Sequence, residues 1–210
     1  MVQYFLMDLN ILMFITLMKY KKLMENIFFD KSKLKYCGEN VIIGKTVRIR
    51  KPEECSIGDG TIIDDFTYIS CAIDIGKNCH IASNVTISGG NGKLTMGDYS
   101  TLSNHCSVHS GSSDYSKVSI DIPSAPKEEQ FGGETKEIKI GNFVTVGAHS
   151  TILPGCDLPD GFSCGAYTLL KENEYKEFSL YIGIPAKFYS YRDVNDFMKT
   201  KLYKKYYGIK

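Results

Sequence analysis

The chain has 210 residues, enough for one well-cored domain with appendages. Its 25 lysines and arginines nearly cancel its 24 aspartates and glutamates, so no global field points to nucleic acid or a strongly acidic partner. The seven cysteines form an odd set without a Cys-x-x-Cys pair, which speaks against a zinc ribbon and a complete disulfide framework and favours a reducing cytoplasm.

The first predicted element is an N-terminal segment, residues 1–39, that we expect to be helical and to cap the next part of the chain. Asp8 and Asn10 interrupt its apolar stretch, which lacks a basic n-region and a small-residue cleavage site and is short for a membrane span. Three interpretations stay open. The stretch is a packed or trimer-contacting helix, a helix on a membrane surface, or the product of a start codon assigned too early, with Met18 and Met24 as in-frame alternatives.

An aliphatic residue recurs every six positions from about Ile43 onward. A period of six matches neither an amphipathic helix nor simple strand alternation, but it suits short strands joined by tight turns. Three such strands make one triangular coil, so the pattern predicts an all-β solenoid. Sorted by side, the inward positions are Ile57, Ile75, Met96, Ile140 and Leu158 on the first, Ile63, Ile81, Leu102, Val146 and Cys164 on the second, and Ile69, Ile87, Val108, Ile152 and Leu170 on the third.

The register closes only if residues 113–137 leave the solenoid as one extended loop and the chain then re-enters on the first side. We therefore expect a solenoid over 40–176 and a C-terminal segment with a helix over 177–210. The open ends need caps, for which residues 20–40 and the tail after Asp193 are available. Four cysteines fall on inward positions and are expected to fill space there: Cys79, Cys106, Cys156 and Cys164.

The hexads, together with Ser179-Leu-Tyr-Ile-Gly-Ile-Pro-Ala-Lys187, resemble the hexapeptide-repeat acyltransferases. The last stretch resembles their closing V-G-N-P-A-[KR] motif, with Ile184 in place of the usual Asn. The resemblance covers roughly residues 40–190. It implies a left-handed parallel β-helix, acetyl-CoA as acyl donor, and homotrimers with active sites between subunits. We expect no metal in this chain.

Acyl transfer needs a base for the acceptor proton, and His is the usual one near neutral pH. His109 comes directly after inward Val108 and should point outward just before the loop. In the hexapeptide-repeat acetyltransferases that this chain resembles, the catalytic His also lies where the chain leaves the solenoid. In the maltose and galactoside acetyltransferases it comes about four residues further along, where this chain has Ser113 and Asp114. A surface or substrate-contacting role is the alternative for His109.

Ser113, Asp114 and Tyr115 are candidate substrate-binding residues. Their segment resembles that of sugar O-acetyltransferases from polysaccharide gene clusters, where an acidic Asp-Tyr segment occupies this place. By that resemblance Asp114 would orient a base or bind sugar hydroxyls.

His80 is the second catalytic candidate, as base or as a contact of the acyl donor. Its segment resembles the HIAPG-type segment of sugar N-acetyltransferases, whose base lies about nine residues earlier, where this chain has Cys71. The register places His80 and His109 apart within one protomer, so we expect them to meet only between subunits. His105 and His149 are interpreted as structural or solvated turn residues.

The coenzyme is expected to contact two corresponding turns with minimal side chains, in which backbone N–H groups are approachable. These turns contain Gly147 with Ala148 and Gly165 with Ala166. A preference of the repeats for Gly at corners explains the same residues.

Two lysines are the expected partners of the coenzyme phosphates. Lys187 takes this role by the resemblance of its motif, and Lys171 falls one place short of the family's lysine. The basic and aromatic tail from Tyr189 onward is open to three interpretations, namely contact with the adenine, contact with a membrane surface, and a capping helix with a solvated basic face.

The sequence thus favours an acetyl-CoA-dependent O-acetyltransferase that acts on a sugar hydroxyl of a cell-surface polysaccharide or lipooligosaccharide or its precursor. The protein is expected to be cytoplasmic, with peripheral contact at the inner membrane left open. An N-acetyltransferase for a nucleotide-linked amino sugar and a noncatalytic scaffold remain alternatives. A zinc enzyme of the γ-carbonic-anhydrase type is disfavoured because the four histidines have the wrong spacing.

Overall fold

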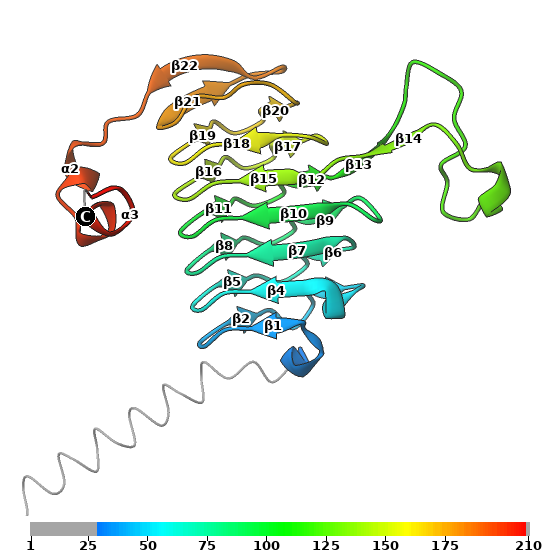
Figure 1. Cartoon of the computed structure of the whole chain (residues 1–210), viewed down its shortest axis with the longest axis horizontal. Coiled ribbons are helices and arrows are strands. Elements are labelled where there is room, and N and C mark those ends of the chain that lie inside the picture. Colours follow the sequence, from blue (N-terminus) through cyan, green and yellow to red (C-terminus); the bar gives the residue numbers. More distant parts are fainter. Residues whose placement is uncertain (1–28, 209–210) are drawn as a thin grey trace, which may run out of the picture.

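The computed structural model describes residues 29–208, so the expectations for the first 28 residues lie outside the described part of the chain. Short parallel strands alternate with tight turns and form six complete coils, and β21 begins a seventh (Figure 1). Each coil contributes one strand to each of three sheets, which we name A, B and C. A parallel β-solenoid is therefore confirmed.

Sheet A holds six strands, namely β1 (Tyr36–Cys37), β4 (Cys55–Ile57), β7 (Ala72–Ile75), β10 (Lys93–Met96), β15 (Ile138–Ile140) and β18 (Asp157–Leu158). Sheet B holds β2 (Ile42–Ile43), β5 (Ile62–Ile63), β8 (His80–Ile81), β11 (Thr101–Leu102), β16 (Thr145–Val146), β19 (Ser163–Cys164), β21 (Ser179–Ile182) and β22 (Lys187–Tyr191). Sheet C holds β3 (Arg48–Ile49), β6 (Tyr68–Ile69), β9 (Thr86–Ser88), β12 (Ser107–His109), β17 (Thr151–Ile152) and β20 (Leu169–Leu170).

The predicted inward columns are confirmed residue by residue. In sheet A, for example, Ile75 pairs with Met96 and Met96 with Ile140. The inward residues of all three columns are at most 4% exposed, so burial of each aliphatic side chain contributes about 1.5–3 kcal/mol. All four cysteines expected inside are buried. The period of six therefore corresponds to inward side chains that stack on those of neighbouring coils.

Aromatic and histidine residues occupy several corners with left-handed backbone, a conformation that Gly, Asn and Asp adopt more readily. At the corner between sheets A and B, Tyr99 and Phe143 have φ of 57° and 58° and their rings stack with centroids 5.5 Å apart. At the corner between sheets B and C, His105, His149 and Tyr167 stack at 4.7 Å steps. Ring stacking along the column helps to offset the cost of a left-handed non-glycine residue.

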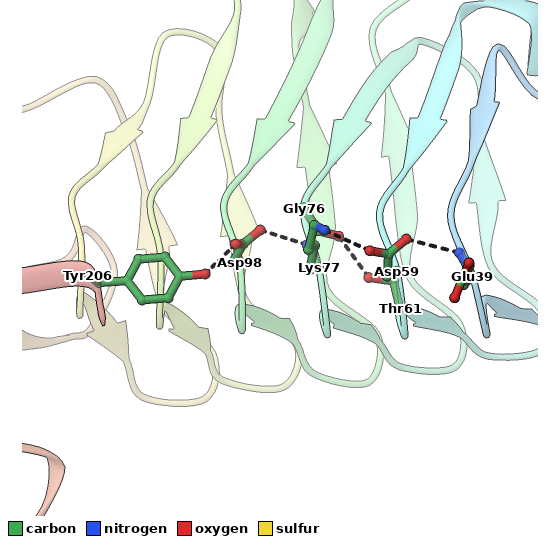
Figure 2. Close-up of polar contacts among 7 residues, drawn as sticks. All are labelled: Glu39, Asp59, Thr61, Gly76, Lys77, Asp98 and Tyr206. Atoms are coloured by element: carbon green, nitrogen blue, oxygen red, sulfur yellow. Dashed lines mark hydrogen bonds and ion pairs between the residues drawn. The ribbon is translucent and has the colours of Figure 1, made fainter. Parts of the chain in front are cut away.

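Carboxylates tie neighbouring coils together along the corner between sheets A and B. Asp59 accepts from the Glu39 amide at 3.0 Å, and Asp98 accepts from the Lys77 amide at 2.7 Å (Figure 2). The Lys77 ammonium bridges back to Asp59 at 2.7 Å. Each carboxylate thus satisfies a turn amide that has no partner within its own coil.

The loop predicted over 113–137 is confirmed and begins as a two-stranded ribbon that projects from the solenoid (Figure 1). Strand β13 (Gly111–Ser113) pairs antiparallel with β14 (Gly133–Thr135), and the loop between them carries the short helix η3 (Lys127–Glu129). The chain re-enters on sheet A at β15, as the register requires.

The tail after Asp193 does not cap the end of the solenoid, contrary to expectation. Helices α2 (Asn195–Met198) and α3 (Lys201–Tyr207) lie along the side of the coils, where the Tyr206 hydroxyl donates to Asp98 (Figure 2). The last coil is instead covered by aromatic rings from the segment before the tail. Among them is Tyr175, which packs on Phe162 and Tyr181.

The first described coil starts beside a 3-10 helix, η1 (Lys31–Lys33), and the buried side chain of Leu34. A second short helix, η2 (Pro52–Glu54), leads into β4. Among residues 29–208 no helix combines the length and hydropathy needed to cross a bilayer.

Candidate active site

Two cavities flank the ribbon of β13 and β14, where the loop leaves sheet C. The first, of about 640 Å³, is the His109 cavity, lined by Gly89, Gly90, Asn91, His109, Gly111, Ser112, Ser113, Tyr115, Asp121, Pro123, Gln130, Gly133, Glu134, Thr135 and Leu153. The second, of about 720 Å³, is the Lys171 cavity, lined by Ser112, Ser113, Asp114, Tyr115, Ser116, Gly132, Gly133, Glu134, Leu153, Pro154, Lys171 and Glu172. Six residues line both, so the ribbon acts as a shared wall.

His109 closes strand β12 and lies half-buried in the first cavity. Its Nδ1 lies 2.8 Å from the Ser88 hydroxyl of the coil below, which leaves Nε2 as the ring nitrogen available to the cavity. Burial lowers the pKa of His109 below its ordinary value of 6.5. The imidazole is therefore neutral at pH 7, as a group that accepts a proton must be.

Asp121 brings a carboxylate into the same cavity. The Ser113 hydroxyl donates to Asp121 Oδ2 at 2.7 Å and so links the ribbon to the returning loop. Of the predicted site residues, His109, Ser113 and Tyr115 line this one cavity. Asp121, which was not predicted, lines it too.

Asp114 lies in the Lys171 cavity and is absent from the lining of the His109 cavity. Its Oδ1 accepts from the Ser116 hydroxyl at 2.6 Å and the Ser116 amide at 3.0 Å, and these hydrogen bonds lower its pKa. Tyr115 is 90% exposed. The carboxylate of Asp114 therefore holds its own turn, and the structure shows no bond between it and His109.

His80 lines neither cavity. It lies on the outer face of sheet B, where its Nε2 is 2.8 Å from Asp64 Oδ2, whereas His109 lies in sheet C. This separation within one protomer agrees with the register.

The expected coenzyme residues fall into two groups. Gly147, Ala148, Gly165 and Ala166 lie at the corner between sheets B and C, and Lys187 opens β22 beside Ile182, which lies over Gly165. Lys171, by contrast, directly follows the C-terminal end of β20 in sheet C and lines the Lys171 cavity.

Gly147 is required by the stacking of the coils. A Cβ there would lie 2.5 Å from the Ala166 amide nitrogen of the next coil. At Gly165 the nearest atom is a side-chain methyl, Ile182 Cγ2, at 3.0 Å, and no backbone atom of residues 29–208 other than those of its chain neighbours lies within 4 Å. Packing thus explains Gly147 whether or not a coenzyme contacts it.

Two residues of this region escaped the sequence reasoning. Ser88 had a signal, because it comes directly after inward Ile87 just as His109 comes after Val108, so the register places Ser88 directly below His109. Asp121 had none, since the hexad pattern carries no information about a loop outside the coils.

The arrangement is suited to acyl transfer. A neutral imidazole, a carboxylate and several hydroxyls converge on an open cavity beside a second one, which leaves room for a donor and an acceptor. No three His, Cys, Asp or Glu side chains of residues 29–208 are grouped to hold a metal ion.

Comparison with known proteins agrees with the fold. Residues 54–89 match the family described as bacterial transferase hexapeptide (six repeats). The structure superimposes on AntD, an N-acyltransferase from Bacillus cereus solved with dTDP and 3-hydroxybutyryl-CoA, with a TM-score of 0.75, 28% identity and coverage of 83% of this chain and 98% of AntD. A maltose O-acetyltransferase from Clostridium difficile 630, at 15% identity, a TM-score of 0.51 and 83% coverage of each chain, shares the fold.

A curated relative places the chain in its family. Over 167 residues this chain is 33% identical to the dTDP-4-amino-4,6-dideoxy-D-glucose acyltransferase of Escherichia coli. The alignment covers 78% of this chain and 85% of the relative. This chain belongs to the hexapeptide-repeat acyltransferases, the acyl-CoA-dependent transferases built on a left-handed parallel β-helix.

Proposed function

We propose that this protein transfers an acyl group from an acyl-CoA to the amino group of a dTDP-linked 4-amino-4,6-dideoxy sugar. The observation that carries the proposal is the 33% identity, over most of both chains, to an enzyme named for that sugar nucleotide. AntD supports it, since one of its variants was solved with dTDP-4-amino-4,6-dideoxyglucose and coenzyme A. These relatives favour the N-acyltransferase alternative over the O-acetyltransferase that the sequence favoured.

His109 supplies the base in this proposal. The acceptor ammonium first loses a proton to solvent, and the neutral amino group then attacks the thioester carbonyl, forming the new C–N bond. As the C–S bond breaks, the coenzyme thiolate leaves, and the proton lost by nitrogen passes through His109 Nε2 to that thiolate. Asp121 attracts the incoming cationic amine and helps to orient it beside His109.

Both cavities serve in this scheme. The acceptor sugar occupies the His109 cavity, and the acyl arm reaches it across the shared wall. The acyl group itself stays open between acetyl and a longer chain, because AntD was solved with 3-hydroxybutyryl-CoA.

A homotrimer remains part of the proposal. Gly165 lies at the corner between sheets B and C, with Lys187 of β22 close by. His109 lies at the opposite, C-terminal ends of the sheet C strands. Both groups contact one coenzyme only if a neighbouring subunit brings its corner to the loop. Light scattering of the purified protein measures the mass, and a monomer that is fully active would exclude this arrangement.

The test is a thiol-release assay with mass spectrometry of the product. The acceptors are dTDP-4-amino-4,6-dideoxyglucose and its matched analogue with a hydroxyl at the same carbon, each with acetyl-CoA and 3-hydroxybutyryl-CoA. We expect acylation of the amino sugar alone. Acylation of the hydroxyl analogue at a comparable rate would restore the O-acyltransferase interpretation.

His109→Ala tests the base in the same assay. Loss of a general base lowers kcat by about 10²–10⁴-fold, while His105→Ala, at an exposed corner, serves as the matched control. Equal activity of both variants would show that His109 is not the base.

A further inference from the structure

A serine of the neighbouring coil holds the candidate base. Strand β9 ends at Ser88, which is the direct register partner of His109 in β12, and Ser88 Oγ lies 2.8 Å from His109 Nδ1. Ser88 does not line the His109 cavity, whereas the imidazole does. The hydroxyl is therefore placed to act through the ring and not on a substrate.

The backbone around Ser88 is tightly fixed. Its carbonyl accepts from the Ser110 amide at 2.8 Å and from the Ser110 hydroxyl at 3.1 Å, and Ser110 is only 1% exposed. The turn after β9 encloses the Ser110 hydroxyl so closely that a Cβ at Gly89 or Gly92 would lie 2.0 or 2.2 Å from Ser110 Oγ. The backbone that carries the Ser88 side chain is therefore held in place beside the imidazole.

This contact has a chemical consequence for the tautomer. The two nitrogens of a neutral imidazole differ, since one carries hydrogen and the other a lone pair. If Nδ1–H donates to Ser88 Oγ, the lone pair is on Nε2, which is the nitrogen left for the cavity. The opposite tautomer would present N–H to the cavity and could not take a proton there.

We infer that Ser88 is a positioning residue that accepts a hydrogen bond from His109 Nδ1–H and so fixes the ring orientation and tautomer in which Nε2 faces the acceptor. The catalytic part of this inference rests on the proposed function, in which His109 is the base. The structural part does not, because ring orientation and tautomer are measurable without turnover.

The structural part is tested by two-bond ¹H–¹⁵N NMR of the four imidazoles at about pH 8, assigned with single His→Gln variants. We expect His109 to carry hydrogen on Nδ1 in the unaltered protein. In Ser88→Ala it shifts towards the Nε2–H form that predominates in free histidine, and Ser88→Thr restores the original pattern. His105 keeps its pattern throughout. An Nε2–H pattern at His109 in the unaltered protein, or no change in Ser88→Ala, overturns the inference.

The catalytic part is tested in the acyl-transfer assay. We expect Ser88→Ala to lower kcat about 10- to 100-fold with KM values within about twofold, because orientation and not binding is lost. Ser88→Thr, which keeps the hydroxyl, should retain most of the rate. Adding Ser88→Ala to His109→Ala should cause no further loss, since both act through one ring.

The outcomes separate the two proposals. Normal kcat in Ser88→Ala, with His109→Ala inactive, overturns the positioning role. Full kcat in His109→Ala shows that His109 is not the general base of the proposed function. The NMR pattern then still decides whether Ser88 fixes the orientation and tautomer of the His109 ring. Thermal unfolding of each variant reports whether a rate loss reflects a damaged fold.

Discussion

The Ser113 hydroxyl donates a 2.7 Å hydrogen bond to Asp121 Oδ2, and this bond holds a loop carboxylate inside the His109 cavity. The two residues come from different parts of the excursion, one from strand β13 and one from the loop beyond it. The contact makes the loop a wall of the site and adds a carboxylate to the cavity that His109 also lines.

Asp121→Asn should weaken use of the amino-sugar acceptor. The amide keeps the size of the side chain but removes the charge that attracts a cationic amine. We expect kcat/KM for the acceptor to fall about tenfold or more, because hydrogen bonds to charged groups contribute about 1.5–3 kcal/mol. Steady-state kinetics measure this, with Asp196→Asn as control, since the Asp196 side chain is 98% exposed on α2. Unchanged kinetics would remove Asp121 from the site.

The pKa of His109 should lie below 6.5, because burial disfavours its charged form. In the unfolded chain the imidazole regains its ordinary affinity for protons. Between the lowered folded pKa and 6.5 the unfolded state binds more protons, so this group destabilises the fold as pH falls through that window.

An NMR titration of the His109 ring, assigned with His109→Gln, measures the midpoint. Urea unfolding at several pH values, with and without His109→Gln, checks the stability effect. A midpoint at or above 6.5 would contradict the prediction.

Gly147→Ala should lower thermal stability, because its Cβ would lie 2.5 Å from backbone atoms of the next coil. We expect a cost of about 1–3 kcal/mol, the usual range for overpacking. Differential scanning fluorimetry measures it, and Ala166→Ser at an exposed position of the next coil is the control. An unchanged Tm combined with a higher KM for acyl-CoA would instead favour a coenzyme role for this glycine.

The tail helix should loosen at alkaline pH. The Tyr206 and Tyr207 hydroxyls donate to Asp98 and Asp160, and burial together with these carboxylates raises the pKa of both phenols above the ordinary 10.0. Their contribution is complete below pH 10.0 and is lost as pH rises towards the folded pKa, because the phenolate cannot donate.

Replacing both phenols with phenylalanine tests this stabilisation. At pH 7 we expect the free energy of unfolding to fall by about 1 kcal/mol for each hydrogen bond removed. The double variant should also show a smaller loss of stability above pH 10.0 than the unaltered protein. Tyr189→Phe is the control, since its side chain is 64% exposed. Equal alkaline sensitivity of the two proteins would contradict the prediction.

The repeat and its consequences were predictable from the sequence. Stacked coils place residues of like position directly above one another, so a period of six translates into register without further information. That is why the columns through Ile57, Ile63 and Ile69, the buried cysteines and the existence of the loop all agree with the structure.

The site depended on tertiary structure, for a physical reason. The loop lies outside the coils, so no register connects Asp121 to Ser113, and its fold depends on contacts between its own side chains. The tail was likewise decided by the match of Tyr206 and Tyr207 to corner carboxylates far away in the chain. Sequence periodicity determined where His109 stands, and the three-dimensional contacts decided which groups surround it.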